Sequence, residues 1–302
     1  MKQNIYAFES ISGMMRKLGQ PAPSHPLIAL LDYSHVHTEL AAPGDKFLLN
    51  FYKISFKTGF HGKVNYGLGY YDFEEGGLAF LGPGQTVTIS ADHGSYEGYS
   101  LFFHPDLIRN YPLGTSIHQY GYFSYAVNEA LLLSENEKNI ITALFHNLSN
   151  ELRNNIDPYS QDIIVSQINL LLDYSNRFFG RQFLTRKPVY NEVIAKMDAY
   201  LHERLYSSNQ LKDGVPTVHE LAGYLGLSPR YLSDMLKSLT GQTAQQHIHD
   251  KLIERAKTIL CKSELSIAEV AYELGFEHPQ SFNKFFRQKV QMSPTAFREN
   301  FQ

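Results

Sequence analysis

The sequence contains a single cysteine, Cys261, and no tryptophan. One cysteine cannot form an intramolecular disulfide, a usage typical of a reducing compartment rather than of a secreted scaffold. No apolar run reaches the about 18 residues that a membrane-spanning helix needs, and residues 1–20 lack the apolar core of a signal peptide. We therefore expect a cytoplasmic protein with no membrane partner.

An excess of charge of one sign is missing as well. The formal net charge is -3, and residues 189–302 contain 13 Lys and Arg against 13 Asp and Glu. A basic excess would indicate binding to nucleic acid or to an anionic membrane surface, and no such excess is present. Any binding of DNA must therefore depend on where individual charges lie.

What is present changes in character along the 302 residues. About residues 27–125 are rich in glycine and aromatic side chains, and their short runs of alternating polarity predict an antiparallel sandwich or barrel. Helical periodicity begins at Ser134, which forms the pattern of a capping box with Glu137. We expect helices over about residues 134–180 and a linker over 181–188, because its Lys-Pro step disfavours a continued helix.

The C-terminal part carries one helical pattern twice. A short helix, a tight glycine turn and a second capped helix make the helix-turn-helix pattern. The first copy has its capping box, glycine turn, Ser-Pro start and glycine stop at Thr217, Glu220, Gly226, Ser228, Pro229 and Gly241. The second has its capping box, turn and proline start at Ser266, Glu269, Gly275 and Pro279.

The two copies align position by position. Ala222 matches Ala271 at an offset of 49, and Leu236 matches Phe286 at an offset of 50, with one residue inserted in the second turn. Between the copies, residues 244–260 have helical spacing and predict a single linker helix. If both second helices enter the major groove on one face of DNA, they should lie about 34 Å apart, one turn of the duplex.

From about residue 190 to residue 301, these motifs resemble the AraC/XylS-type transcription regulators. The resemblance is carried by Ile267–Phe276, Ser281-Phe282, Phe285–Arg287, Ser293-Pro294 and Phe297-Arg298. It implies an α+β, multi-domain fold. Residues 1–185 would form a cupin-like antiparallel β-barrel followed by helices, which binds an effector or dimerises. Residues 186–302 would form an all-α domain with two helix-turn-helix units joined by a linker helix.

The second helix of each unit is expected to contact DNA. The outward polar residues are Arg230, Ser233, Asp234 and Lys237 in the first unit, and Gln280, Ser281, Asn283, Lys284 and Arg287 in the second. Gln and Asn pair bidentately with adenine, and Arg pairs with guanine. Asp234 stands where the family often has a basic residue and would repel a phosphate, so we expect the second unit to contribute more of the affinity. Gln291 replaces the glycine that usually ends the last of these helices, which predicts a less sharply formed cap.

The N-terminal part is expected to bind a small-molecule effector, a sugar or another organic compound. Its candidate lining residues are Tyr52, Phe56, Tyr66, Tyr70 and Phe80, although a well-filled core explains these aromatic residues equally well. The resemblance also implies a homodimer, with double-stranded DNA and RNA polymerase as partners. The two helices between Ser134 and about Phe179 are the candidate dimerisation elements, and packing within the domain is the alternative reading of them. We predict a transcription regulator with no catalytic activity, no metal and no cofactor.

Two other functions stay open. His35, His37 and Glu39 are the residue types of a metallocupin site. However, Pro43-Gly44 follows at once, and no histidine comes shortly after the Gly82–Gly84 turn, which favours a surface loop. The helical hairpins would alternatively serve a protein-interaction scaffold. Stoichiometric iron, zinc or manganese would support the enzyme, and salt-dependent DNA binding would argue against the scaffold.

Overall fold

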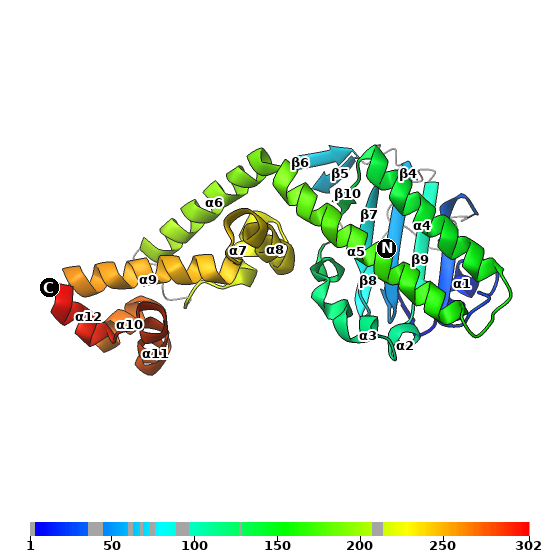
Figure 1. Ribbon diagram of the computed structural model, residues 1–302. Coiled ribbons are helices and arrows are strands. Elements are labelled where there is room, and N and C mark those ends of the chain that lie inside the picture. The colour runs from blue at the N-terminus through cyan, green and yellow to red at the C-terminus, as the bar shows by residue number, and fades with distance from the viewer. Residues whose placement is uncertain are drawn as a thin grey trace. The chain divides into compact units, whose positions relative to one another are not determined.

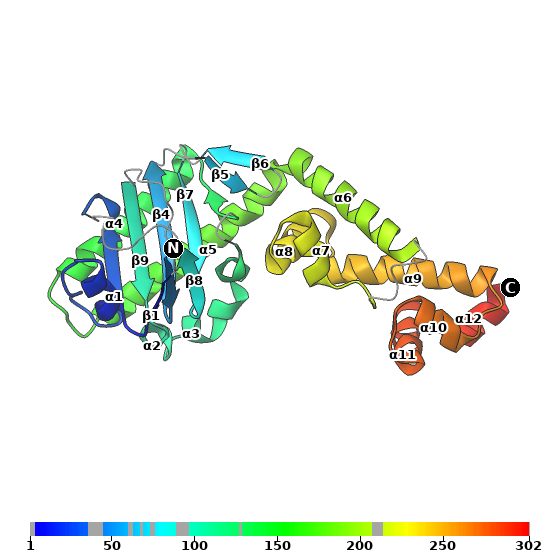
Figure 2. The same ribbon diagram turned by 180° about the vertical axis from the view of Figure 1, so that it is seen from behind.

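The computed structural model describes residues 4–35, 45–59, 63–66, 69–72, 76–88, 97–126, 129–206 and 214–301. The chain divides into two compact units, Met1–Thr185 and Arg186–Gln302, and both are drawn in Figures 1 and 2. Within the described ranges, none of the helices combines the length and the hydropathy that a membrane crossing requires.

The first unit is built on two sheets and a hairpin (Figure 1). One sheet has the strand order β10-β7-β4-β9-β2, the other has the order β1-β3-β8, and β5 pairs with β6. Every pair is antiparallel except β1 with β3, which is parallel and departs from the expected purely antiparallel barrel. The strands are β1 (Ile5–Phe8), β2 (Ile28–Asp32), β3 (Lys46–Leu49), β4 (Tyr52–Gly59), β5 (Lys63–Tyr66), β6 (Gly69–Asp72), β7 (Gly77–Leu81), β8 (Gln85–Thr88), β9 (Glu97–Phe103) and β10 (Leu131–Leu132).

A short N-terminal helix, α1 (Ile11–Lys17), contributes to the core between the two sheets. Its buried side chains pack with residues from both sheets, because alternate positions of β2, β3 and β9 point to the same side. The cluster comprises Ile11, Met14, Met15, Ala29, Leu31, Phe47, Leu49, Phe51 and Phe102. This space is therefore filled by apolar side chains.

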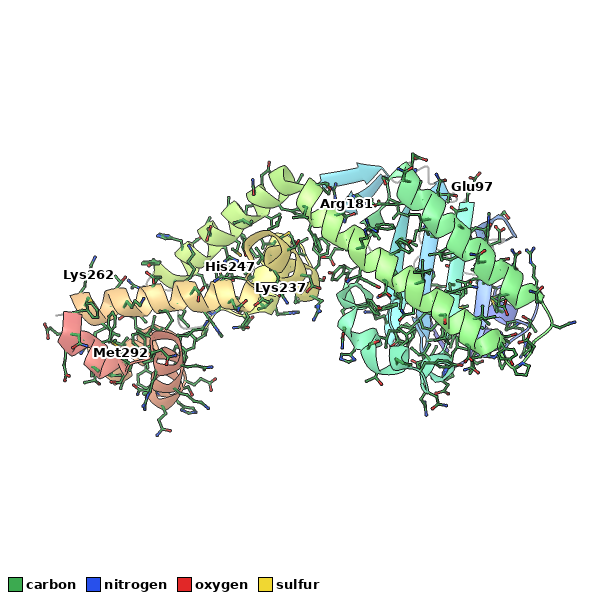
Figure 3. All side chains as sticks on the ribbon, viewed as in Figure 1. Glu97, Arg181, Lys237, His247, Lys262 and Met292 are labelled. Atoms are coloured by element: carbon green, nitrogen blue, oxygen red, sulfur yellow. The ribbon has the colours of Figure 1, made fainter. Side chains whose placement is uncertain are left out.

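Two long helices, α4 (Glu135–Arg153) and α5 (Ser160–Thr185), pack on the other face of the five-stranded sheet (Figures 1 and 2). Ser134 begins α4 with the predicted capping box. Arg181 of α5 forms an ion pair with Glu137 at 2.6 Å (Figure 3). The connection from β9 to β10 contains short α and 3-10 helices at Pro105–Ile108 (α2), Pro112–Ser116 (α3), Ile117–Gln119 and Gly121–Ser124, and a further 3-10 turn lies at Tyr33–His35.

The predicted linker over residues 181–188 is wrong. Helix α5 continues to Thr185, and the next helix, α6 (Lys187–Tyr206), begins after one residue. Pro188 lies in the first turn of α6, where the missing N–H of proline removes no intrahelical hydrogen bond.

The second unit is all helical. Helices α7 and α8 form one helix-turn-helix and α10 and α11 form the other, and Figures 1 and 2 show the two pairs beside opposite ends of α9. Helix α9 contacts α6, α7, α8, α10 and α12. The bounds are α7 (Val218–Leu225), α8 (Pro229–Thr240), α9 (Ala244–Lys262), α10 (Ile267–Glu273), α11 (Pro279–Val290) and α12 (Pro294–Phe301). The predicted fold class, a sheet-rich N-terminal part followed by helices and a helical C-terminal domain, is confirmed.

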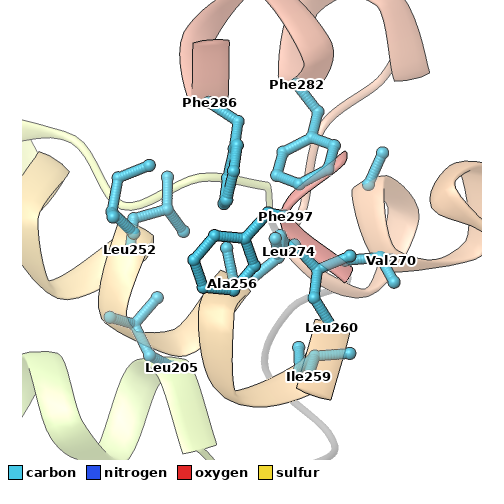
Figure 4. Close-up of a cluster of buried hydrophobic side chains, with 12 residues drawn as sticks. Leu205, Leu252, Ala256, Ile259, Leu260, Val270, Leu274, Phe282, Phe286 and Phe297 are labelled. Carbon is cyan, nitrogen blue, oxygen red and sulfur yellow. The ribbon is translucent and has the colours of Figure 1, made fainter. Parts of the chain in front are cut away.

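One apolar cluster joins the second helix-turn-helix to α9 (Figure 4). Phe282 and Phe286 of α11 are fully buried in it and lie against Phe297 of α12 and the C-terminal half of α9. In the first helix-turn-helix, the hydroxyl of Tyr231 lies 2.9 Å from that of Tyr190 on α6. Buried contacts thus hold both helix-turn-helix motifs on α9 and α6. These contacts fix the direction in which α8 and α11 face.

Candidate nucleic-acid interface

The first helix-turn-helix is shaped by its caps. Thr217 and Glu220 form the predicted capping box at α7, and Gly226 ends this helix in the left-handed region at φ 68°. The hydroxyl of Ser228 then accepts a hydrogen bond from the N–H of Tyr231, with Pro229 as the first residue of α8. These interactions span three or four residues, so the local sequence alone forms the turn between the two helices.

The second helix-turn-helix repeats this plan with one difference. Ser266 and Glu269 form the capping box of α10, and Gly275 turns the chain at φ 81°. Helix α11 begins with Pro279, but the side chain of His278 makes no capping hydrogen bond. Among the described residues no side chain caps the first turn of α11, and the N–H of Ser281 donates instead to the carbonyl of His278 at 3.0 Å. A helix start without a side-chain cap suits contact with a phosphate.

All the residues predicted to contact DNA lie away from the buried faces of α8 and α11. Arg230 and Lys237 are exposed on α8, while Ser233 and Asp234 are half-buried on the same helix. The predicted residues of α11 are all exposed, namely Gln280, Ser281, Asn283, Lys284 and Arg287. Each helix thus presents one polar face, with its apolar face buried.

An intrahelical ion pair occupies the polar face of α8. The Nε of Arg230 donates to a carboxylate oxygen of Asp234 at 2.9 Å. The pair partly neutralises the one basic group near the beginning of this helix. The four-residue spacing of an arginine and an aspartate is visible in the sequence and would have predicted the contact.

The charges of α11 are distributed differently. Lys289 lies 3.6 Å from Asp250 of α9, so it serves partly to attach α11 to that helix. Within the described part of the chain, no ion pair engages Lys284 or Arg287. Their positive charges are therefore available on the exposed face of α11.

The end of α11 corrects one expectation. Gln291 adopts the left-handed conformation at φ 62°, and its N–H donates to the carbonyl of Arg287 at 2.9 Å. Gly241 ends α8 in the same way, with φ 78° and a bond of 3.0 Å to Lys237. The cap of α11 is therefore as sharply formed as that of α8, contrary to the prediction, because the turn to α12 imposes the left-handed conformation even on a residue with a Cβ atom.

Two histidines of α9 add no positive charge near neutral pH. Burial is the main cause that lowers the pKa of His247 and of His249 below the usual histidine value, and the nearby Lys289 lowers that of His249 further. Nε2 of His247 lies 2.8 Å from the hydroxyl oxygen of Thr240, the last residue of α8. Both imidazoles are neutral at pH 7, so lysine and arginine supply the positive charge of this unit.

Two of the predicted effector-binding residues are core residues instead. Phe56 is fully buried and stacks on Phe145 of α4 at 5.5 Å, and Phe80 packs on Tyr122 at 4.4 Å. Strand alternation places both on the face of the sheet that α4 and α5 cover, which leaves no room for a ligand beside them.

Of the other three predicted effector-binding residues, the structure describes the side chain of Tyr52 alone. Tyr52 is half-buried and stacks on Phe103 at 4.8 Å. Tyr66 and Tyr70 lie on β5 and β6, and their side chains lie outside the described part of the structure.

The histidine-rich segment offers no described metal site. His37 and Glu39 lie outside the described residues, as does the side chain of His35. Among the residues that are described, no three His, Cys, Asp or Glu side chains gather where they would bind a metal ion. Cys261 is half-buried on α9 and packs against the apolar cluster of the second helix-turn-helix.

Two known families match separate parts of the chain. Residues 221–300, which include both helix-turn-helix units except the start of the first, match the family described as a helix-turn-helix domain. Residues 52–159 match the family described as an AraC-like ligand binding domain.

Two curated relatives each match less than half of the chain. The regulatory protein PocR of Salmonella typhimurium is 31% identical over 116 residues, which are 38% of this chain and 36% of that protein. The transcriptional activator RhaS of Escherichia coli is 33% identical over 79 residues, 26% of this chain and 28% of that protein. Over the first three relatives, the match spans 31% to 39% of their length.

Solved structures match a similar share. The C-terminal domain of the response regulator yesN from Fusobacterium nucleatum is 29% identical, with a TM-score of 0.31, over 35% of this chain and 98% of that one. The DNA-binding domain of AdpA, in complex with a target DNA, is 28% identical, with a TM-score of 0.30, over 37% of this chain and 90% of that one.

Proposed function

Because this chain belongs to the AraC-type transcription regulators, we propose that it binds specific sites in double-stranded DNA through α8 and α11 and regulates transcription there. The observation that carries the proposal is the repetition of the helix-turn-helix on one supporting helix, with polar residues on the exposed face of both α8 and α11. A protein that acts on chromosomal DNA would work in the cytoplasm.

The supporting helix sets the geometry of the DNA site. Helix α9 has 19 residues and is about 28 Å long. One helix-turn-helix packs beside each of its ends (Figure 2), so the two units are held a fixed distance apart. We expect a DNA site with two boxes about one helical turn apart, read from the same face of the duplex.

The two helix-turn-helix motifs are expected to contribute unequally to the DNA affinity. On α8, Arg230 is engaged by Asp234, and the carboxylate lies on the face that would approach DNA. On α11, Lys284 and Arg287 are exposed, and no acidic residue occurs on that helix. We therefore expect the box contacted by α11 to contribute more of the affinity and to be the better conserved of the two in selected sequences.

Selection of bound duplexes from a random library, with purified full-length protein, tests this function. Two boxes one turn apart are expected, and failure to enrich any motif at low salt would contradict the proposal. The second measurement is the salt dependence of binding to the selected site. Lys284→Ala with Arg287→Ala should lower the slope of log K against log salt by about 2. Lys196→Ala with Lys262→Ala removes two exposed charges from α6 and from the end of α9 and should change the slope by less.

Exposed apolar residues on α5 support a homodimer. Ile163, Leu170 and Leu184 are 42%, 45% and 53% exposed and follow a seven-residue spacing, which Arg177 interrupts. Such a stripe is typical of helices that pair with another helix. Analytical ultracentrifugation should give a dimer for the native protein and a monomer for Ile163→Lys with Leu170→Lys, whereas Asn169→Lys, on the neighbouring face, should remain dimeric.

An effector or partner that binds the N-terminal unit is expected to change how that unit presents the DNA-binding unit to DNA. RNA polymerase is the expected partner at a promoter. Equal DNA affinity of the full-length protein and of residues 186–302, under every effector tried, would contradict this coupling.

A further inference from the structure

One carboxylate on the supporting helix contacts the ends of both DNA-reading helices. Asp250 lies in the N-terminal half of α9, and each of its two oxygens has a partner. The side-chain amide of Gln242, in the turn that follows α8, donates to Oδ2 at 2.9 Å. The ammonium group of Lys289, in the last turn of α11, lies 3.6 Å from Oδ1. One side chain of α9 thus connects the two helix-turn-helix motifs.

On the side of α8, the turn is formed by hydrogen bonds that do not involve the amide of Gln242. The N–H of Gln242 donates to the hydroxyl of Thr240 at 3.2 Å. That hydroxyl lies 2.8 Å from Nε2 of His247, three residues before Asp250 on α9. Gly241 supplies the left-handed residue that ends α8. The side chain of Gln242 can therefore be removed while the hydrogen bonds that form the turn stay in place.

On the side of α11, polar and apolar contacts lie at different points along α9. The ring of His249 packs edge-on against Phe285 of α11, with 5.0 Å between the ring centroids. Phe286 is buried farther along α9, in the apolar cluster that includes Leu252 and Leu260 (Figure 4). The pair of Lys289 and Asp250 adds a third contact. A helix that is attached at several points turns less freely than a helix that is attached at one.

The other charged or titratable groups near Asp250 do not compete with Lys289. Lys251 pairs with Asp198 of α6 at 3.0 Å. The two histidines that flank Asp250 are neutral near pH 7, since burial above all lowers the pKa of each. The side chain of Asp250 is 48% exposed, so the ion pair adds little to stability, because solvent screens exposed pairs. Its contribution lies in direction, because hydrogen bonds depend steeply on geometry and apolar contacts do not.

We infer that Asp250 is a positioning residue that fixes the orientation of α8 relative to α11 and thereby the spacing of the two DNA boxes that the protein accepts. The inference rests on the DNA-binding function proposed above. Asp250 acts through Gln242 and Lys289, and its own role requires no contact with DNA.

The expected consequence is selectivity between DNA sites that differ only in the distance between their boxes. One inserted base pair moves a box by about 3.4 Å and rotates it by about 34° around the duplex. Two reading helices in a fixed orientation cannot follow this change and keep both sets of contacts, whereas a loosened pair follows it in part. Loss of Asp250 should therefore weaken the selectivity for spacing and leave the reading of a single box unchanged.

Fluorescence anisotropy with full-length protein measures the Kd for three duplexes. They are the site selected from the random library, the same site with one base pair inserted between the boxes, and the same site with the α8 box scrambled. The insertion should weaken binding of the native protein at least tenfold, as the loss of a base contact does. Asp250→Ala should reduce this ratio about fivefold, the factor that corresponds to one ordinary hydrogen bond. Gln242→Ala should reduce it similarly, and the double variant no further than Asp250→Ala alone, because both changes remove the same contact.

Glu254→Ala is the matched control. Glu254 is 67% exposed on the same helix, and its carboxylate pairs with Lys257 of α9 itself, at 3.4 Å. Glu254→Ala and Asp250→Ala each remove one negative charge, so both should strengthen binding to all three duplexes alike. Only Asp250→Ala should change the ratio between the two spacings.

The inference is overturned if the native protein has no spacing preference, if Asp250→Ala keeps the native ratio, or if Glu254→Ala lowers the ratio equally. Additive effects of Asp250→Ala and Gln242→Ala would also overturn it. Circular dichroism checks that each variant is folded, and Gln242→Ala decides if Asp250→Ala is not. A selected motif whose spacing preference survives these changes refutes the role of Asp250 alone, and the absence of any motif refutes the regulator.

Discussion

Gly226 and Gly275 hold the same position in the two helix-turn-helix units, yet replacing them by alanine is expected to have unequal effects. Both adopt left-handed backbone conformations, at φ 68° and φ 81°. A Cβ atom at Gly226 would meet nothing within 4 Å. At Gly275 it would lie 2.6 Å from the carbonyl carbon of Gly214 and 2.9 Å from the N atom of Val215. The second substitution therefore adds a collision with backbone to the conformational cost.

The magnitudes follow from these two contributions. The left-handed conformation costs a residue with a Cβ atom about 1 kcal/mol, so Gly226→Ala should lower the free energy of unfolding by about that amount. Gly275→Ala carries the same cost. It must also displace the segment at Gly214, an overpacking that typically adds about 2 kcal/mol. The expected total of about 3 kcal/mol is a large part of the stability of a small domain.

Urea denaturation followed by hydrogen exchange and mass spectrometry separates this unit from the N-terminal one, because peptides from α10 and α11 are measured individually. With a denaturant slope of about 2 kcal/mol per molar, the midpoints should fall by about 0.5 M for Gly226→Ala and about 1.5 M for Gly275→Ala. Equal shifts for the two variants would refute the reasoning, because they would mean that the backbone at Gly214 moves aside at no cost. DNA binding should weaken more for Gly275→Ala, since its turn leads directly into α11.

Three further predictions concern single side chains. Gln291→Gly should raise the free energy of unfolding by about 1 kcal/mol, because glycine adopts φ 62° without a steric cost. Gly241→Ala, with open space around the added Cβ atom, should lower it by a similar amount, and urea midpoints measure both changes. Arg181→Ala should lower the free energy of unfolding by about 2 kcal/mol, because it leaves the buried carboxylate of Glu137 without its cation. This figure is already reduced for solvent screening, since the arginine side chain is 35% exposed. Thermal denaturation measures the loss, and a cost no larger than that of an exposed ion pair would contradict the burial of the Glu137 carboxylate. Asp234→Asn should raise DNA affinity about fivefold at low salt, because it releases Arg230 and removes a negative charge facing the duplex; weaker binding would mean that Asp234 instead orients Arg230.

The helix boundaries of the C-terminal unit were largely predictable from the sequence. The capping boxes at Thr217 and Ser266, the turn at Gly226 and the start at Pro229 all depend on contacts within four residues, so a short stretch of chain contains both partners. The same locality explains why the outward faces of α8 and α11 were recognisable: burial of one apolar face leaves the polar residues on the other.

The errors arose where distant segments meet. Phe56 alternates with polar neighbours along β4, and only the packing of α4 against the sheet decides that it is a core residue. The continuation of α5 to Thr185 depends on buried contacts such as that of Phe183, which outweigh the weak local preference of the following Lys-Pro step. No pattern in the sequence indicated the contacts of Asp250, because its partners come from the turn after α8 and from α11, and only the packing of both on α9 brings them together.

The sequence by itself determined the repeated helix-turn-helix, its capping boxes and its polar faces, because each of these rests on hydrogen bonds and periodicity over a few residues. Tertiary structure decided which charges stay available and which aromatic residues are buried. On α11, Lys289 forms an ion pair with Asp250 of α9 at 3.6 Å. Lys284, also on α11, is exposed and has no ion pair in the described part of the chain. Such pairings join residues from different helices, and only the packing of those helices brings the two charges together.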